Sequence, residues 1–180
     1  MKIVLCGYMG AGKSLIGKKI AKKLSFHFVD LDKKIADREQ LGIPEIFAEK
    51  GEIHFRKTEA SLLRETLNSE ENMVLALGGG TPCYGQNLQW IKDHPETILI
   101  YLKMNLQALT DRLFEERKNR PLISNVDTRD ALEDFIRKHI FERRYYYLQS
   151  DYTVDCSTAS PGEIVMEILA ETGRAGGEDS

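Results

Sequence analysis

Long apolar runs and a surplus of basic side chains are both missing from the sequence. The longest apolar stretches among its 180 residues are segments such as Met73–Leu77 and Ile98–Leu102, far below the roughly 20 residues that a membrane helix needs. Lys and Arg together number 25 against 28 acidic residues, which gives a formal net charge of −3. We therefore expect neither a membrane span nor nucleic acid as a partner, and any cationic chemistry has to be local.

Paired cysteines are missing as well. The three cysteines, Cys6, Cys83 and Cys156, show no C-x-x-C spacing and cannot all pair within one chain. This favours a reducing compartment over a disulfide framework. The first residues run from a short apolar segment into glycines, without an extended apolar region and a small-residue cleavage site, so we expect no export and a cytoplasmic location.

What is present is an alternation of short β-rich segments with longer segments of helical spacing. The β-rich segments are Ile3–Cys6, Phe26–Val29, Met73–Leu77, Ile98–Leu102 and Tyr152–Val154. Their almost continuous apolar character predicts burial on both faces, as in a parallel sheet covered by helices. The chain is long enough for one core and too short for two, so we expect a single α/β domain over residues 1–172 with three layers around a five-stranded parallel sheet.

The intervening segments predict helices and one insertion. Lys13–Leu24 and Asn105–Arg117 place apolar side chains on one face each and are expected to be amphipathic helices. The region of about residues 31–68 is too long for one helix and is interrupted by Gly42-Ile43-Pro44 and by Gly51. We expect two or three helices there, which would form an inserted substrate-binding region.

A glycine-rich segment directly follows the first β-rich segment. Gly7–Ser14 matches the spacing G-x-x-x-x-G-K-[ST] and leads into a helical pattern. Glycines allow backbone amides to turn toward phosphate oxygens, and the amino end of the helix adds donors and a positive dipole. Lys13 can supply charge to the β- and γ-phosphates, and the Ser14 hydroxyl can ligate Mg²⁺. The expected nucleotide-binding residues here are Gly10, Ala11, Gly12, Lys13, Ser14 and Leu15.

A phosphate loop does not by itself define a kinase, because GTPases, ATPases and transporters share it. The sequence contains no Asn-Lys-x-Asp segment of the kind that gives guanine specificity. The third β-rich segment is followed by Gly78, where many ATPases carry an acidic metal-binding residue. These two features weaken the interpretation as a switch protein, and the phosphoryl acceptor has to be identified from other residues.

Asp30 and Asp32 follow the second β-rich segment. Two residues apart in an extended segment, their carboxylates would share a face toward the phosphate loop. One can organise Mg²⁺ through a water, and the other can accept hydrogen bonds from hydroxyl groups of the acceptor. The alternative is that one of them caps the following helix.

Arginines and glycines complete the set of candidates. Arg56 and Glu59 lie three apart on an expected helix and can meet on its surface, and a plain surface ion pair is the alternative. Arg143 has a similar alternative, the solvated face of a charged helix. Gly78–Gly80 would allow a ligand to approach the backbone closely, and a loose turn is the alternative.

The segment Glu115–Asp130 is rich in charge, contains Pro121 and shows little periodicity. It predicts a mobile surface loop, or alternatively an ordinary linker. If about residues 115–127 close over a nucleotide as a lid, Arg120 can neutralise charge on the transferring phosphoryl group. Residues 173–180, with three glycines and two acids, are expected to be a disordered tail.

Together these segments resemble the shikimate kinase family, a branch of the P-loop fold of nucleoside-monophosphate kinases. The likeness covers Met1–Leu169. It rests on Gly7–Ser14, Asp30-Leu31-Asp32, Ile46–Glu52 followed by Phe55–Glu59, Gly78-Gly79-Gly80, and Arg120-Pro121-Leu122. The resemblance implies phosphorylation of the shikimate 3-hydroxyl by ATP with Mg²⁺, giving ADP and 3-phosphoshikimate in aromatic amino-acid biosynthesis, by a monomer.

The resemblance also implies roles for individual residues. Ser14 and Asp30 would hold the metal, Lys13, Asp32 and Arg120 would be catalytic, and Arg112 and Pro161 would enclose the adenine. The implied shikimate-binding residues are Asp32, Arg56, Glu59, Gly78, Gly79, Gly80 and Arg143. Phe47 and Phe55 match aromatic positions beside the pocket.

One departure from the family pattern concerns the second arginine for the carboxylate. Family members commonly show Arg-x-Pro before an apolar residue and a tyrosine, whereas this chain has Arg143-Arg144-Tyr145-Tyr146-Tyr147 without the proline. Either Arg143 or Arg144 could bind the carboxylate, and Arg143 is preferred because it keeps the spacing to Tyr147. Two alternatives to shikimate kinase are a gluconate or nucleotide kinase on the same scaffold and a nucleotide-binding regulator without phosphotransfer.

Overall fold

The computed structural model describes residues 1–173 except the side chains of Asn119 and Pro121, so the expected tail lies, apart from Gly173, outside the described residues. The strands are β1 (Lys2–Cys6), β2 (His27–Asp30), β3 (Met73–Ala76), β4 (Thr97–Lys103) and β5 (Tyr152–Asp155). The helices are α1 (Lys13–Leu24), α2 (Leu31–Glu39), α3 (Ile43–Leu67), α4 (Asn87–Asp93), α5 (Leu106–Glu116), α6 (Arg129–Tyr147) and α7 (Pro161–Glu171). Short 3₁₀ turns are η1 (Thr81–Cys83), η2 (Arg117–Asn119) and η3 (Pro121–Ile123).

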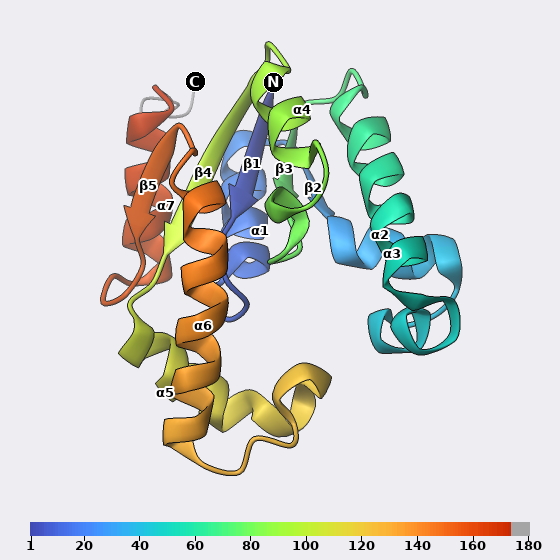
Figure 1. Cartoon of the computed structure of the whole chain (residues 1–180). Helices are drawn as coiled ribbons and strands as arrows, with labels where there is room; N and C mark the ends of the chain where they lie inside the picture. Colours follow the sequence, from blue (N-terminus) through green and yellow to red (C-terminus); the bar gives the residue numbers. More distant parts are fainter. Residues whose placement is uncertain (174–180) are drawn as a thin grey trace.

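The five strands form one parallel sheet in the order β2-β3-β1-β4-β5, which confirms the predicted sheet. Because β1 is the central strand and pairs with both β3 and β4, the segments that follow β1 and β3 leave the sheet side by side. All carboxyl ends lie at one edge of the sheet, the lower edge in Figure 1. Ligands of open α/β sheets bind at this edge.

Side chains alternate across β1 and divide the core into two halves. Ile3 and Leu5 pack with residues of α1, α5, α6 and α7, whereas Val4 and Cys6 pack with residues of α2, α3 and α4. All four side chains are fully buried. Helices therefore cover both faces of the sheet, and the predicted three-layer α/β/α arrangement is confirmed (Figure 1).

The region after β2 folds as α2 and the long helix α3, which extend to one side of the sheet (Figure 1). Within α3 the backbone leaves helical geometry at Gly51, at φ 78° and ψ 168°. The Glu39 carboxylate joins the end of α2 to both sides of this bend, because it accepts hydrogen bonds from Lys50 at 2.6 Å and from Thr58 at 3.0 Å. Hydrogen bonds from Lys50 and then from His54 lower the pKa of Glu39 to about 2, so this carboxylate is ionised at neutral pH.

The segment that follows α5 contains the turns η2 and η3 rather than irregular backbone only. Ile123, at the end of η3, is fully buried and belongs to the core cluster with α5 and α6. One apolar side chain thus anchors a segment that the charged sequence predicted to be a loop. Within residues 1–173, no helix combines the length and the apolar character needed to cross a membrane.

Candidate active site

The phosphate loop connects β1 to α1 at the carboxyl edge of the sheet. Gly12, immediately before α1, has φ 91°, a left-handed conformation that side-chain-bearing residues rarely adopt. The Lys13 ammonium folds back over the loop and donates hydrogen bonds to the carbonyl oxygens of Gly7 at 2.8 Å and Tyr8 at 3.0 Å. Burial lowers the pKa of Lys13 to about 8, against the opposing influence of Asp32. The ammonium is therefore held at the place where the motif predicts phosphate oxygens.

Ser14 and Asp30 meet beside this loop. The Ser14 hydroxyl donates a hydrogen bond of 2.6 Å to Asp30 Oδ2, and Asp30 Oδ1 accepts from the Lys33 backbone amide at 3.3 Å. Asp30 therefore caps α2, as the alternative interpretation held, and still directs one oxygen toward Ser14. A hydroxyl and a carboxylate oxygen are hard ligands that suit Mg²⁺, whose remaining positions are usually filled by phosphates and waters.

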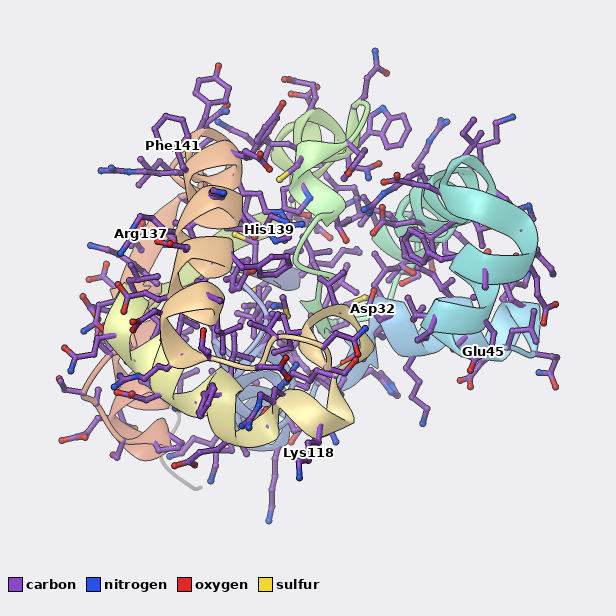
Figure 2. All side chains as sticks on the ribbon, turned by 60° about the horizontal axis from the view of Figure 1, so that its bottom comes forward. Asp32, Glu45, Lys118, Arg137, His139 and Phe141 are labelled. Atoms are coloured by element: carbon purple, nitrogen blue, oxygen red, sulfur yellow. The ribbon has the colours of Figure 1, made fainter. Side chains whose placement is uncertain are left out.

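Asp32 lies two residues further on, in the first turn of α2. Burial, and next the charge of Asp30, raise the pKa of Asp32 to about 6. Figure 2 shows Asp32 near the middle of the molecule, between α6 and the α2–α3 region. Its carboxylate is thus half-buried, directed inward and still ionised at neutral pH.

The glycine triplet after β3 brings three polar side chains together. A Cβ atom on Gly78 would lie 2.6 Å from Asp32 Oδ1, one on Gly79 would lie 3.5 Å from Arg143 Nη1, and one on Gly80 would lie 3.1 Å from Arg56 Nη2. Each of these distances is at or below ordinary contact, so the side chains lie directly against the backbone. Three consecutive residues therefore face a carboxylate and two guanidinium groups.

Arg56 is held from several sides. Its Nη1 donates to Glu59 Oε2 at 2.9 Å, and Glu59, whose side chain is only 1% exposed, also accepts a 2.7 Å hydrogen bond from the Thr81 hydroxyl. The ring of Tyr84 lies over the guanidinium, with its centroid 3.6 Å from Arg56 Cζ. Glu59 is therefore not part of a plain surface pair. Thr81 and Tyr84 were not recognised from the sequence, because neither belongs to a motif.

The structure separates Arg143 from Arg144. His139, one turn before Arg143, points inward in Figure 2, whereas Arg137, two turns before Arg144, points outward. Arg143 is half-buried beside Gly79, while Arg144 is exposed and lines a different cavity, next to Leu106 and Leu148. The preference for Arg143 over Arg144 thus agrees with their positions.

Tyr147 fixes this corner of the site. Its hydroxyl donates a 2.5 Å hydrogen bond to the Gly79 carbonyl and also contacts the Arg143 side chain. The ring is fully buried and stacks on Tyr101, with 5.0 Å between the centroids. Burial raises the pKa of Tyr147 far above its usual value, so the phenol remains a hydrogen-bond donor.

A cavity of about 530 Å³ extends over the phosphate loop. Its described lining includes Gly10, Gly12, Lys13, Ser14, Leu15, Asp30, Asp32, Gly79, Arg112 and Arg120. Arg120 is held by Glu116 through its Nε at 2.9 Å, and Arg112 donates to the Gly10 carbonyl at 2.7 Å. Ala11 is buried within the loop. The described lining thus includes the expected nucleotide, metal and catalytic residues except Ala11 and Pro161.

Pro161 is the second residue expected to contact the adenine. It is exposed at the first turn of α7 and is absent from the described lining of the cavity. Ser160 caps α7 and forms a reciprocal capping box with Glu163, which makes Pro161 the first helical residue. Phe55 is buried and Phe47 is 37% exposed, with their ring centroids 4.5 Å apart.

The parallel sheet, the phosphate loop after its central strand and the acidic pair after β2 define a P-loop phosphotransferase of the α/β class. The family model for shikimate kinase matches residues 9–172. The chain belongs to the shikimate kinase family.

Individual relatives agree with this assignment. A shikimate kinase from Flavobacterium psychrophilum is 42% identical over 93% of this chain and 96% of that protein. The crystal structure of shikimate kinase from Bacteroides thetaiotaomicron matches with a TM-score of 0.88 and 31% identity, covering 96% of this chain and 98% of that one. Shikimate kinase from Acinetobacter baumannii, solved in complex with shikimate, gives a TM-score of 0.85 and 29% identity over 98% of this chain and 95% of that one.

Proposed function

We propose that this protein is a shikimate kinase that transfers the terminal phosphoryl group of ATP to the 3-hydroxyl of shikimate. The observation that carries the proposal is the glycine triplet, whose three residues face Asp32, Arg143 and Arg56 in turn. The two guanidinium groups can bind a carboxylate of the substrate, and the Asp32 carboxylate can accept hydrogen bonds from its hydroxyls. All three side chains lie against consecutive glycines. Shikimate carries both kinds of group on a single ring.

The two arginines would bind the shikimate carboxylate from adjacent positions. A guanidinium group presents a planar pair of N–H donors that matches the two oxygens of a carboxylate. Arg56 keeps Nη2 beside Gly80 while Nη1 is occupied by Glu59. We therefore propose that Arg56 and Arg143 orient the ring, with residues of α2 and α3 forming the substrate-binding region.

Asp32 would bind shikimate hydroxyls at the other end of the ring and accept the proton of the attacking one. Its raised pKa of about 6 makes it a better base than an exposed aspartate, while it stays ionised at neutral pH. Phosphoryl transfer through a loose transition state depends mainly on positioning and charge stabilisation, so a strong base is not required.

Lys13 and Arg120 would stabilise charge on the transferring group. Both line the cavity over the phosphate loop, and Arg120 lies in the segment of residues 115–127 that we propose to close as a lid. Ser14 and Asp30 would hold Mg²⁺, which supplies further positive charge at the phosphates when bound. The three cysteines are free thiols, which supports the proposed cytoplasmic location.

The pH dependence of catalysis should follow Asp32 and Lys13. Because the pKa of Asp32 is raised to about 6 and its ionised form is required, kcat/KM should fall as the pH drops below that value. Because the pKa of Lys13 is lowered to about 8 and its protonated form is required, kcat/KM should also fall above that value. A pH series on the wild type checks both limbs. If the fall of kcat/KM at low pH is absent in Asp32→Asn, that fall is caused by protonation of Asp32. A wild-type kcat/KM that stays constant between pH 5 and 9 would contradict the roles of both residues.

Measurement of ADP formation with a panel of acceptors tests the proposed function. Shikimate, gluconate and nucleoside monophosphates are offered at equal concentrations with ATP and Mg²⁺. Turnover that depends on shikimate is expected. Preference for another acceptor would indicate a different kinase on this scaffold, and ATP binding without turnover would indicate a regulator.

A further inference from the structure

Tyr84 stacks on one of the two arginines that face the glycine triplet. The centroid of its ring lies 3.6 Å from Arg56 Cζ, closer than the 5.0 Å that separates Arg56 Cζ from the Phe55 centroid. Its Cε2 atom would lie 3.4 Å from a Cβ atom on Gly80. The ring therefore occupies a corner between the guanidinium and the triplet.

Of the two rings near Arg56, Tyr84 is the closer one to the guanidinium plane, and the polar contacts of Arg56 are made at its edge. Nη1 is bound to Glu59 at 2.9 Å, and Nε lies 3.5 Å from Glu52. Both of these partners lie on α3 with Arg56, whereas Tyr84 approaches from the segment that follows η1. A guanidinium group can tilt about a hydrogen bond made by its edge nitrogens without breaking that bond. An aromatic ring against its face removes that freedom and adds a cation–π attraction.

The backbone of Tyr84 is joined to the triplet by a hydrogen-bonded turn. The Cys83 amide donates to the Gly80 carbonyl at 2.9 Å, and the Asn87 amide donates to the Tyr84 carbonyl at 3.3 Å. The same turn therefore sets the backbone positions of Gly80 and of Tyr84, from which the ring reaches Arg56. A second cavity of about 440 Å³ is lined by both Arg56 and Tyr84, so the stacked pair also faces this space.

We propose that Tyr84 is a positioning residue for the acid end of shikimate, acting through Arg56. By holding the guanidinium plane, the ring presents Nη2 of Arg56 toward the space beside Gly80 where the carboxylate would bind. By covering one face, it reduces the access of water and strengthens the ion pair. This inference rests on the proposed function.

The test is a comparison of three substitutions of Tyr84 in steady-state kinetics. Tyr84→Ala should raise the KM for shikimate by roughly three- to thirtyfold, the range expected for loss of a cation–π contact, with kcat and the KM for ATP unchanged. Tyr84→Phe should keep the wild-type KM because the stack does not need the hydroxyl. Tyr84→Leu, which keeps an apolar side chain without a ring, should resemble Tyr84→Ala. Tyr145→Ala, a tyrosine that is 72% exposed on α6, is the matched control and should have no effect.

A double-mutant cycle with Arg56→Lys separates positioning from a general structural effect. If Tyr84 acts through the guanidinium, Tyr84→Ala should cost little in the Arg56→Lys background, so the two effects are not additive. If Tyr84→Ala turns over shikimate with the wild-type kcat and KM, the role given to Tyr84 is wrong, while the proposed function still stands. Additive effects, or an equal rise of the ATP KM, would also overturn the role given to Tyr84. Absence of shikimate turnover in the wild type would instead overturn the proposed function.

Discussion

Replacing Lys13 with alanine is expected to lower kcat by about 10²–10³, the range found when one donor to a developing oxyanion is removed. The Lys13 side chain is half-buried against the phosphate loop, where two backbone carbonyls hold its ammonium and where burial lowers its pKa. In such surroundings a charge interacts strongly with the β- and γ-phosphates, because little water screens it. Its removal leaves charge on the transferring phosphoryl group without a partner.

Single-turnover kinetics measures this effect on the chemical step. Lys19→Ala is the matched control, because Lys19 is an exposed lysine on the same helix, and it should retain wild-type kcat. A Lys13→Ala variant that binds ATP and turns over within about threefold of the wild type would contradict the role given to the phosphate loop in catalysis.

Replacing Arg56 with alanine is expected to weaken shikimate binding by on the order of 2–5 kcal/mol, the range for truncation of one member of a desolvated charge pair. This corresponds to a rise in Kd of about 30- to 5,000-fold. The side chain is 20% exposed, and its partner Glu59 is 1% exposed. If Arg56 were an ordinary surface residue, the loss would be below about 1 kcal/mol.

Calorimetric titration of shikimate gives this Kd, with thermal unfolding of each variant measured in parallel because the change leaves Glu59 buried without its cation. Arg56→Lys keeps a cation for Glu59 and loses only the planar fork, so it should fold and still bind shikimate more weakly. Arg64→Ala is the control on the same helix, since Arg64 is exposed and stacks on Trp90 at 4.7 Å. Unchanged shikimate affinity in Arg56→Ala would exclude the carboxylate clamp.

The parallel sheet and α1 were predictable because their signals are local. An apolar strand followed by the phosphate-loop spacing fixes where β1 ends, and the observed α1 has the predicted bounds Lys13–Leu24. Helix α4 was not predicted, since it spans only seven residues and its N-cap residue Gln86 makes no side-chain capping hydrogen bond. Such a short helix is stabilised by packing of Leu88 and Ile91 into the core, which no short sequence pattern reports.

The residues of the candidate site that belong to a sequence motif were predictable. Those that reach the site only through long-range contacts were not. The phosphate loop, Asp32 and the glycine triplet have fixed spacing, and they meet because parallel strands end at one edge. The choice between Arg143 and Arg144 depends on the rotation of α6, since neighbouring residues on a helix point about 100° apart. Thr81 meets Glu59 across 22 positions of the sequence, and only the folded chain brings such pairs together.

Calorimetric titration of shikimate into two neighbouring variants shows whether Arg143 is the second arginine of the carboxylate site. Arg143→Gln and Arg144→Gln remove the same charge from adjacent positions of α6, but only Arg143 lies beside Gly79. We expect a Kd raised by about tenfold or more in Arg143→Gln and within about twofold of the wild type in Arg144→Gln. Equal losses in the two variants, or a larger loss in Arg144→Gln, would contradict a carboxylate site formed by Arg56 and Arg143.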